Sequence, residues 1–543
     1  MIDFNTCPEE YRHWKLSFEG AVATLVMSVR QDEPFVEGYE LKLNSYDLGV
    51  DIELADAVQR IRFEHPEVKV VVITSGLERV FCAGANIRML ASSSHPFKVN
   101  FCKYTNETRL AIEDASRGSG IRWIAALNGL AAGGGYELAI ACDEIYLVDD
   151  GNSAVSLPEV PLLGVLPGTG GLTRLVDKRK VRRDHADVFS TLVEGVKGRR
   201  AKAWNLIDDS FPKSRFADAV QERARALVRA SKRRAEGPGI ELSPIRCEAS
   251  DSRLAYRHLD VDIDRDERIA TLTLRGPEGP QPTNPDAYLE AGDSCWVLQC
   301  FRELDHALCQ LRFSFGEIGL LLLRTRGDRD ALLEVERGLA AHRDHWLVHE
   351  ILLFLARSLR RYELTSRSLF ALVDQDSAFG GIFLELALAG DRIYMVDDAE
   401  RPAGIAIGPL SGGLLPMSNG LTRLGSRFLA DPARAEKLAL EQPALDASEA
   451  EELGLVTFRV DELDWEDDIR IAVEERASLS PDALTGMEAS LRFGGAETCD
   501  SKIFGRLSAW QNWIFTRPNA TGETGALVRY GEPEDARFDW RRT

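Results

Sequence analysis

An internal repeat constrains the fold of this 543-residue chain more than any other feature of its sequence. Four segments of the first half recur in the second half, in the same order and at nearly constant spacing. The matched pairs are Val22–Arg30 with Ile269–Pro277, Val70–Gly76 with Leu320–Asp328, Arg122–Asp150 with Arg367–Asp398, and Leu166–Asp177 with Leu415–Ser426. Ordered matches of this kind are not expected by chance. We therefore interpret the chain as a tandem duplication.

Each copy alternates strand-like and helix-like segments. Two strand-like segments come first, followed by a predicted helix (Asp51–Phe63 or Gln299–Phe313) and then by a buried apolar strand. Strands that alternate with helices at this spacing are typical of an α/β fold. The polar stretch Ser231–Asp251, which contains proline and glycine, is predicted to join the two copies.

These patterns predict four parts of the chain. The first domain is expected at residues 1–235, a linker at 236–255, a second domain at 256–480 and a helical, aromatic-rich extension at 481–543. We expect the extension to pack across both halves as a shared lid or as a dimerisation element.

Composition and charge exclude several classes of function. The formal net charge of −20 argues against a general nucleic-acid-binding protein, which needs a basic surface. The nine cysteines form no CxxC pair, so neither a disulfide framework nor a zinc ribbon is predicted. His342, His345 and His349 lack an HExxH pattern, and no metal site is predicted. No apolar run reaches the roughly 20 residues that span a bilayer, and the polar start is no signal peptide. A cytoplasmic protein is expected.

Two glycine-containing loops in the first copy could supply main-chain N–H donors. One is Gly133–Gly135, which opens a helix that carries Glu137, and the other is Phe81–Ile87, which follows a strand. Two N–H groups that converge on a carbonyl oxygen form an oxyanion hole. A second carboxylate, Glu159, follows another strand-like segment. Paired carboxylates near an oxyanion hole suit acid–base chemistry on a carbonyl compound.

The motifs AGAN-I, NGxAxGGGxELAxxCD and PEVxLLGVLPGTGGLTRL in the first copy resemble the crotonase (enoyl-CoA hydratase/isomerase) superfamily. The resemblance implies a tandem pair of crotonase-like ββα-repeat domains. It also implies that the N–H groups of Ala85 and Gly134 hold the thioester oxygen of an acyl-CoA. Glu137 and Glu159 match the acid–base glutamates of the hydratases. Asn86 departs from the aspartate that members often carry.

Cys102 lies in the segment Phe97–Ser116, which is predicted to help wall the acyl pocket. Two interpretations stay open for its thiol: direct contact with the acyl group, or simple packing within a helix.

The second copy is degenerate. Glu385 matches Glu137, but the counterpart of Glu159 falls at Gly408, and no AGA-type loop follows Leu320–Thr325. We therefore expect this half to be structural.

The tandem arrangement resembles a branch of the superfamily that opens the ring of a benzoyl-CoA epoxide with water during aerobic benzoate degradation. Its products are formate and an open-chain semialdehyde-CoA. This resemblance implies a lyase that needs no metal or redox cofactor, acts on an acyl-CoA substrate and forms a homodimer. The residues of the CoA nucleotide pocket stay unassigned. One alternative is hydration or isomerisation of another enoyl-CoA. A second alternative is a non-catalytic acyl-CoA-binding protein.

Overall fold

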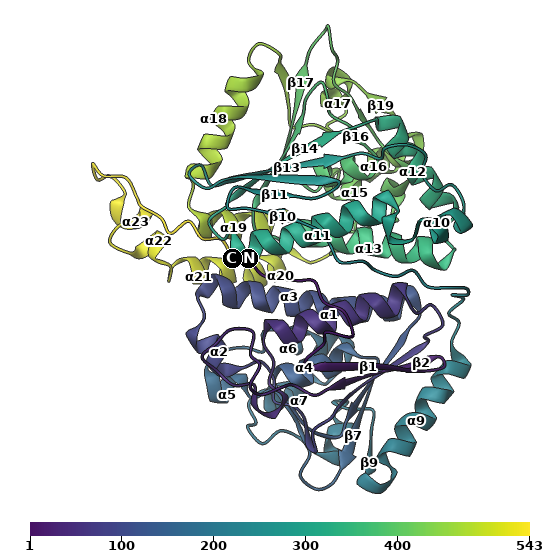
Figure 1. Cartoon of the computed structure of the whole chain (residues 1–543). Helices are drawn as coiled ribbons and strands as arrows, with labels where there is room; N and C mark the ends of the chain where they lie inside the picture. Colours follow the sequence, from purple (N-terminus) through teal and green to yellow (C-terminus); the bar gives the residue numbers. More distant parts are fainter. The chain divides into compact units, whose positions relative to one another are not determined.

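The computed structural model describes all 543 residues and divides into two units (Figure 1). We call residues 4–244 the N-terminal unit, and residues 1–3 with 245–543 the C-terminal unit. The division between Pro244 and Ile245 lies inside the stretch that was predicted to be a linker. No helix in the structure combines the length and the apolar character needed to cross a membrane.

The N-terminal unit is built on a six-stranded sheet in the order β1-β2-β3-β5-β7-β9. β1 and β2 are antiparallel and the other neighbours are parallel. Its strands are β1 (Trp14–Glu19), β2 (Val22–Met27), β3 (Val70–Ser75), β5 (Arg122–Leu127), β7 (Glu144–Asp149) and β9 (Asp209–Pro212). A second, three-stranded parallel sheet contains β4 (Arg79–Cys82), β6 (Gly129–Ala132) and β8 (Val155–Ser156).

The helices of the N-terminal unit cover the larger sheet and connect its strands. They are α1 (Leu48–Phe63), α2 (Ile87–Ser92), α3 (His95–Asp114), α4 (Gly134–Ala141), α5 (Glu159–Leu163), α6 (Gly171–Thr173), α7 (Arg183–Phe189), α8 (Gly198–Ala203) and α9 (Lys213–Ala230). Helix α1 begins three residues before the predicted Asp51, because the Asp47 side chain accepts the N–H of Val50 and caps the helix.

Both faces of the larger sheet are buried. On one face, alternate residues such as Val72, Ile124 and Tyr146 pack against α9 (Figure 1). The residues between them, among them Ile73 and Trp123, are fully buried on the other face. Burial on both faces explains why β3 is an uninterrupted apolar run.

The C-terminal unit has an eight-stranded sheet in the order β10-β11-β12-β13-β14-β15-β17-β20. The strands are β10 (Glu248–Ala249), β11 (Arg253–Ala255), β12 (Leu259–Asp264), β13 (Ile269–Arg275), β14 (Leu320–Arg326), β15 (Ser368–Val373), β17 (Arg392–Asp397) and β20 (Phe458–Asp461). β12 and β13 are antiparallel, and the pairs that follow as far as β20 are parallel. This is the same pattern as that of β1 to β9 in the N-terminal unit. A small sheet again lies apart, made of β16 (Phe379–Gly380), β18 (Ile405–Ala406) and β19 (Ala444–Leu445).

The helices of this unit are α10 (Pro285–Ala291), α11 (Trp296–Ser314), α12 (Arg329–Ala341), α13 (Trp346–Glu363), α14 (Ile382–Leu388), α15 (Arg423–Arg427), α16 (Pro432–Glu441), α17 (Ala447–Glu452) and α18 (Trp465–Ser478). The extension is helical, as predicted, with α19 (Pro481–Leu491), α20 (Cys499–Lys502), α21 (Ser508–Ile514), α22 (Pro518–Thr521) and α23 (Ala526–Arg529). A buried ion pair of Arg492 with Asp391 at 2.7 Å and a hydrogen bond from the Arg542 guanidinium to Gly319 O at 3.2 Å tie the extension to its own unit. Its role as a lid or a dimerisation element stays a prediction.

Candidate active site

The start of helix α4 carries the first donor loop. The chain reaches it through Gly133, whose φ of +51° lies in the left-handed region that favours glycine. A Cβ on Gly134 would overlap the hydroxyl of Tyr46, so the helix can approach Tyr46 only with glycine there. The N–H of Gly134 opens the helix and therefore has no intrahelical partner. It is available to a ligand oxygen.

The second donor loop lies directly against the first. A Cβ on Gly84, whose φ is +93°, would come within 3.0 Å of Gly134 N. The backbone of Tyr46 holds this loop on both sides of Ala85: its N–H donates to Gly84 O at 3.0 Å, and its carbonyl accepts the N–H of Asn86 at 2.8 Å. No protein atom accepts the N–H of Ala85. The structure thus brings the two predicted N–H donors onto adjoining loops.

We expect Gly134→Ala to lower kcat about tenfold, because the added methyl must displace either Tyr46 or the start of α4 and so move the Gly134 N–H. Steady-state kinetics would measure the loss. Gly412→Ala is the matched control, since a Cβ there meets open space. Equal activity in the two variants would remove the Gly134 N–H from the account.

Glu137 lies in the first turn of α4 and is buried, with 2% of its surface exposed. Its carboxylate accepts the N–H of Thr169 at 2.9 Å, the N–H of Gly171 at 2.8 Å and the Thr169 hydroxyl. Three donors to one carboxylate fix its orientation. The segment Gly168–Gly171 therefore holds a carboxylate.

Glu159 begins the short helix α5 and is the second carboxyl group of the site. Its Oε1 lies 2.7 Å from where a Cβ of Gly133 would stand, so it covers the start of α4. Its Oε2 is buried without a hydrogen-bond partner. Burial, and then the charge of Glu137, raise the pKa of Glu159 to about 7. A carboxyl group in this state can carry or release a proton near neutral pH.

Cys102 lies beside the segment that holds Glu137. Its Sγ is 3.2 Å from where a Cβ of Gly168 would stand, and Asn106 of the same helix donates to Gly168 O at 2.9 Å. Burial, and then Glu137, raise the pKa of the Cys102 thiol to about 11. Cys102 is therefore a neutral thiol at physiological pH, not a thiolate nucleophile. The structure thus gathers all five predicted site residues around α4.

Two groups of this site were missed by the sequence analysis. Tyr46 connects the donor loops, and its hydroxyl is buried without a partner. The guanidinium of Arg109 lies 5.2 Å from the centre of the Tyr46 ring and forms a buried ion pair with Asp51. No motif marks Tyr46, whereas the glycines around Thr169 were a usable signal. No group of three or more His, Cys, Asp or Glu side chains is arranged to hold a metal ion.

The sequence of the chain is similar to those of known proteins. Residues 40–237 match the enoyl-CoA hydratase/isomerase family. The full chain is 53% identical to benzoyl-CoA-dihydrodiol lyase of Aromatoleum evansii, over 543 residues that cover 100% of this chain and 98% of the relative. The chain belongs to the benzoyl-CoA-dihydrodiol lyase family. The predicted crotonase resemblance is thereby confirmed.

Other relatives resemble only part of the chain. Carnitinyl-CoA dehydratase of Proteus mirabilis is 30% identical over 189 residues, which cover 34% of this chain and 67% of that protein. The crystal structure of an enoyl-CoA hydratase from Geobacillus kaustophilus is 32% identical and covers 40% of this chain and 75% of its own, with a TM-score of 0.35. In the benzoyl-CoA-dihydrodiol lyase family, by contrast, the similarity extends over both units.

The C-terminal unit contains residues that correspond to part of the candidate active site, but their contacts differ. Gly381 has a φ of +52° and precedes α14, as Gly133 precedes α4, and Glu385 follows at the same spacing as Glu137. Glu385, however, forms a buried ion pair with Arg423 at 3.1 Å. The predicted absence of a second donor loop is confirmed, because α12 follows β14 directly.

Two predictions about this unit are wrong. By strand register, Ile405 matches Val155, so the counterpart of Glu159 is Pro409 and not Gly408. The expected loss of the second carboxyl group is also wrong, because α12 supplies Glu336. Its Oε1 lies 2.8 Å from where a Cβ of Gly381 would stand, much as Glu159 lies against Gly133. The repeat alignment hid this, since Glu336 lies outside the four matched segments, between Asp328 and Arg367.

Glu336 is fully buried, and its Oε2 accepts the N–H of Leu410 at 3.2 Å. Burial raises the pKa of Glu336 to about 8, so the side chain is neutral in the folded state at pH 7. With Glu385 paired to Arg423 and no second donor loop, this unit lacks the parts that make the N-terminal site suited to catalysis.

We expect Glu336→Gln to stabilise the protein at pH 8. Folding raises the pKa of Glu336. The contribution of this group to the free energy of unfolding is therefore fully present below about pH 4.5 and is lost as the pH rises toward 8. The amide removes that loss, on the order of 3–5 kcal/mol at pH 8 and far less at pH 5. Chemical denaturation at both pH values measures the difference. Exposed Glu334→Gln on the same helix is the control and should change neither value.

Proposed function

We propose that this chain is a ring-opening lyase of the benzoyl-CoA-dihydrodiol lyase type. Its substrate is 2,3-epoxy-2,3-dihydrobenzoyl-CoA, and its products are 3,4-didehydroadipyl-CoA semialdehyde and formate, in aerobic benzoate degradation. Atoms balance when two water molecules are consumed. The observation that carries the proposal is the 53% identity over the full chain. It is supported by the intact set of two donor loops and two carboxyl groups in the N-terminal unit.

The geometry suits each step. The N–H groups of Ala85 and Gly134 hold the thioester oxygen and stabilise the charge that develops on it. Glu159, with a raised pKa of about 7, donates a proton to the oxygen of the opening epoxide. Glu137, held in position by the N–H groups of Thr169 and Gly171, orients water. The neutral Cys102 thiol walls the acyl pocket.

The remaining features of the proposal concern the assembly. The two units are a tandem pair of crotonase-like ββα-repeat domains, of which the second is degenerate; their shared strand order supports this. The protein requires no cofactor, since the reaction is neither an oxidation nor a reduction overall. It forms a cytoplasmic homodimer that binds neither nucleic acid nor membrane. Light scattering of the purified protein tests the dimer, and a monomeric mass would contradict it.

The test of the proposed function is a comparison of two substrates. Purified protein is given crotonyl-CoA, followed by loss of the conjugated thioester absorbance, and epoxybenzoyl-CoA generated in situ, followed by formate release. We expect formate release with little hydration of crotonyl-CoA. Rapid crotonyl-CoA hydration without formate would favour the alternative of an enoyl-CoA hydratase. Tight thioester binding without either product would favour the binding-only alternative.

A further inference from the structure

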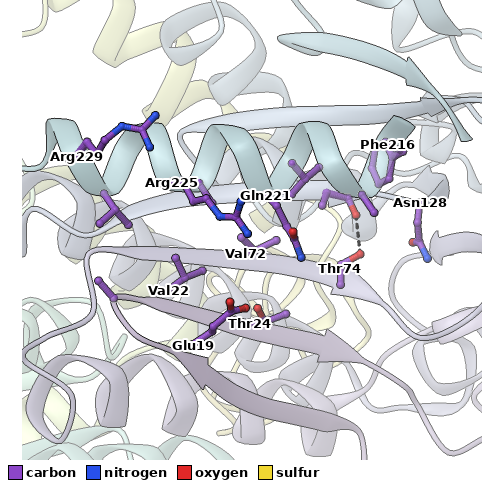
Figure 2. Close-up of a pocket in the computed structure, with 16 residues that line it drawn as sticks. Glu19, Val22, Thr24, Val72, Thr74, Asn128, Phe216, Gln221, Arg225 and Arg229 are labelled. Carbon is purple, nitrogen blue, oxygen red and sulfur yellow. Dashed lines mark hydrogen bonds between the residues drawn. The ribbon is translucent and has the colours of Figure 1, made fainter. Parts of the chain in front are cut away.

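A cavity of about 600 Å³ lies between helix α9 and the larger sheet of the N-terminal unit (Figure 2). We call this cavity, between helix α9 and strands β2, β3 and β5, the α9 slot. Its walls are mainly apolar and include Val22, Val72, Phe216, Val220 and Ala224. None of its lining residues belongs to the candidate active site. The α9 slot is therefore a separate feature of the same unit.

The α9 slot is long. Its lining residues on α9 extend from Phe216 to Arg229, and a helix rise of 1.5 Å per residue makes this distance about 20 Å. This length accommodates an extended chain.

Small side chains create the α9 slot. Strand register matches Val72 with Leu322, because Thr24 pairs with Val72 as Thr271 pairs with Leu322. In the same way Ala126 matches Leu372, since both pair with a tyrosine of the next strand. In the C-terminal unit the larger Leu322 and Leu372 belong to the buried cluster between the sheet and α18. The smaller valine and alanine leave more room at these positions of the N-terminal unit.

The polar groups at the Phe216 end of the slot also differ between the units (Figure 2). Thr74 and Asn128 stand where the C-terminal unit has Arg324 and Asp374, which form an ion pair at 2.7 Å. Asn128 donates its amide to the carbonyl groups of Ser75 and Leu77, which fixes the orientation of the amide. Its Oδ1 accepts no hydrogen bond. This end of the slot has lost a charged pair and keeps an unpaired acceptor.

The Arg229 end of the slot has a net positive charge. Arg225 extends from α9 toward the strands (Figure 2), and Arg229 lies one turn further along the helix. Neither guanidinium has an ion pair or a hydrogen bond in the structure. Glu19 lies on the opposite rim and pairs with neither of them. Two cations and one anion leave a charge of about +1, which favours an anionic group in a chain of net charge −20.

We propose that the α9 slot binds an extended, amphipathic monocarboxylate. Its apolar chain lies along the apolar lining of the slot, and its carboxylate lies at Arg225, which offers planar, bidentate donors. This inference does not depend on the proposed function, because the slot shares no residue with the acid–base site.

Calorimetric titration with dodecanoate, below its micelle concentration, tests this proposal on the full-length protein. We expect one dodecanoate per chain. Butyrate, with the same head group and a short chain, and dodecyltrimethylammonium, with the opposite charge, should each bind at least tenfold more weakly. No binding of dodecanoate, or equal binding of the cationic amphiphile, would overturn the proposal.

Variants locate the binding. Ala126→Leu introduces the residue found at the matching position of the C-terminal unit, and it should weaken dodecanoate binding about tenfold or more, since each excluded methylene costs about 0.8 kcal/mol. Arg225→Gln should weaken binding, and Glu19→Gln should strengthen it. Arg215→Gln on the same helix, outside the slot, is the matched control. Affinity that stays unchanged in Ala126→Leu and Arg225→Gln would place the binding elsewhere and overturn the proposal.

Discussion

Glu159→Gln lowers kcat by about a hundredfold or more, with the KM of the thioester nearly unchanged. The amide keeps the size and position of the side chain against Gly133 but cannot deliver a proton. Folding should not suffer, because the wild-type carboxyl group is costly to bury, as its raised pKa shows. Kinetics and thermal denaturation together measure the effect. Full activity in this variant would remove Glu159 from the mechanism.

The pH profile gives the same residue a second test. With a pKa raised to about 7, Glu159 is protonated below pH 7 and ionised above it. A proton donor is lost on ionisation, so kcat/KM falls as the pH rises through about 7. Glu159→Gln should lack this limb. If kcat/KM instead fell as the pH was lowered through about 7, Glu159 would be assigned the role of base.

Glu137→Gln is expected to have an effect of similar size, about a hundredfold or more on kcat. The N–H groups of Thr169 and Gly171 both donate to Oε1, which an amide oxygen can replace, whereas the Thr169 hydroxyl donates to Oε2, where an amide nitrogen cannot accept it. The variant therefore loses the negative charge and one of the three hydrogen bonds. Thioester binding, which depends on the N–H groups of Ala85 and Gly134, should change little.

Thr169→Val provides a graded control for Glu137. It removes the hydroxyl donor and leaves the two N–H donors in place. We expect a loss of kcat of about tenfold, smaller than that of Glu137→Gln. An equal loss in both variants would mean that the position of the Glu137 carboxylate matters and its charge does not.

The sequence predicted the parts of the site that depend on local pattern. Glycines at positive φ and a carboxylate one turn into a helix have recognisable signals, so the two loops, Glu137 and Glu159 were found before the fold. The α/β class also followed, because apolar strands and helices alternate along both copies. The start of α1 differed by three residues, since the cap of Asp47 was overlooked.

The parts that sequence reasoning missed depend on contacts between distant segments. Tyr46 contacts the start of α4 through the fold and is hydrogen-bonded to the Gly84 loop. Glu336 reaches Gly381 from a segment outside the matched parts of the repeat. The α9 slot results from the sizes of Val72 and Ala126 relative to their counterparts, which only strand register reveals.

Formate yield in matched variants tests the central claim, that the N-terminal unit alone opens the ring with its two glutamates. Formate is quantified against epoxybenzoyl-CoA consumed by the wild-type chain, by a Glu137→Gln, Glu159→Gln double variant and by Glu336→Gln. The account predicts one formate per substrate in the wild type and in Glu336→Gln, and none above background in the double variant. Formate release that persists in the double variant, or that is lost in Glu336→Gln, would contradict it.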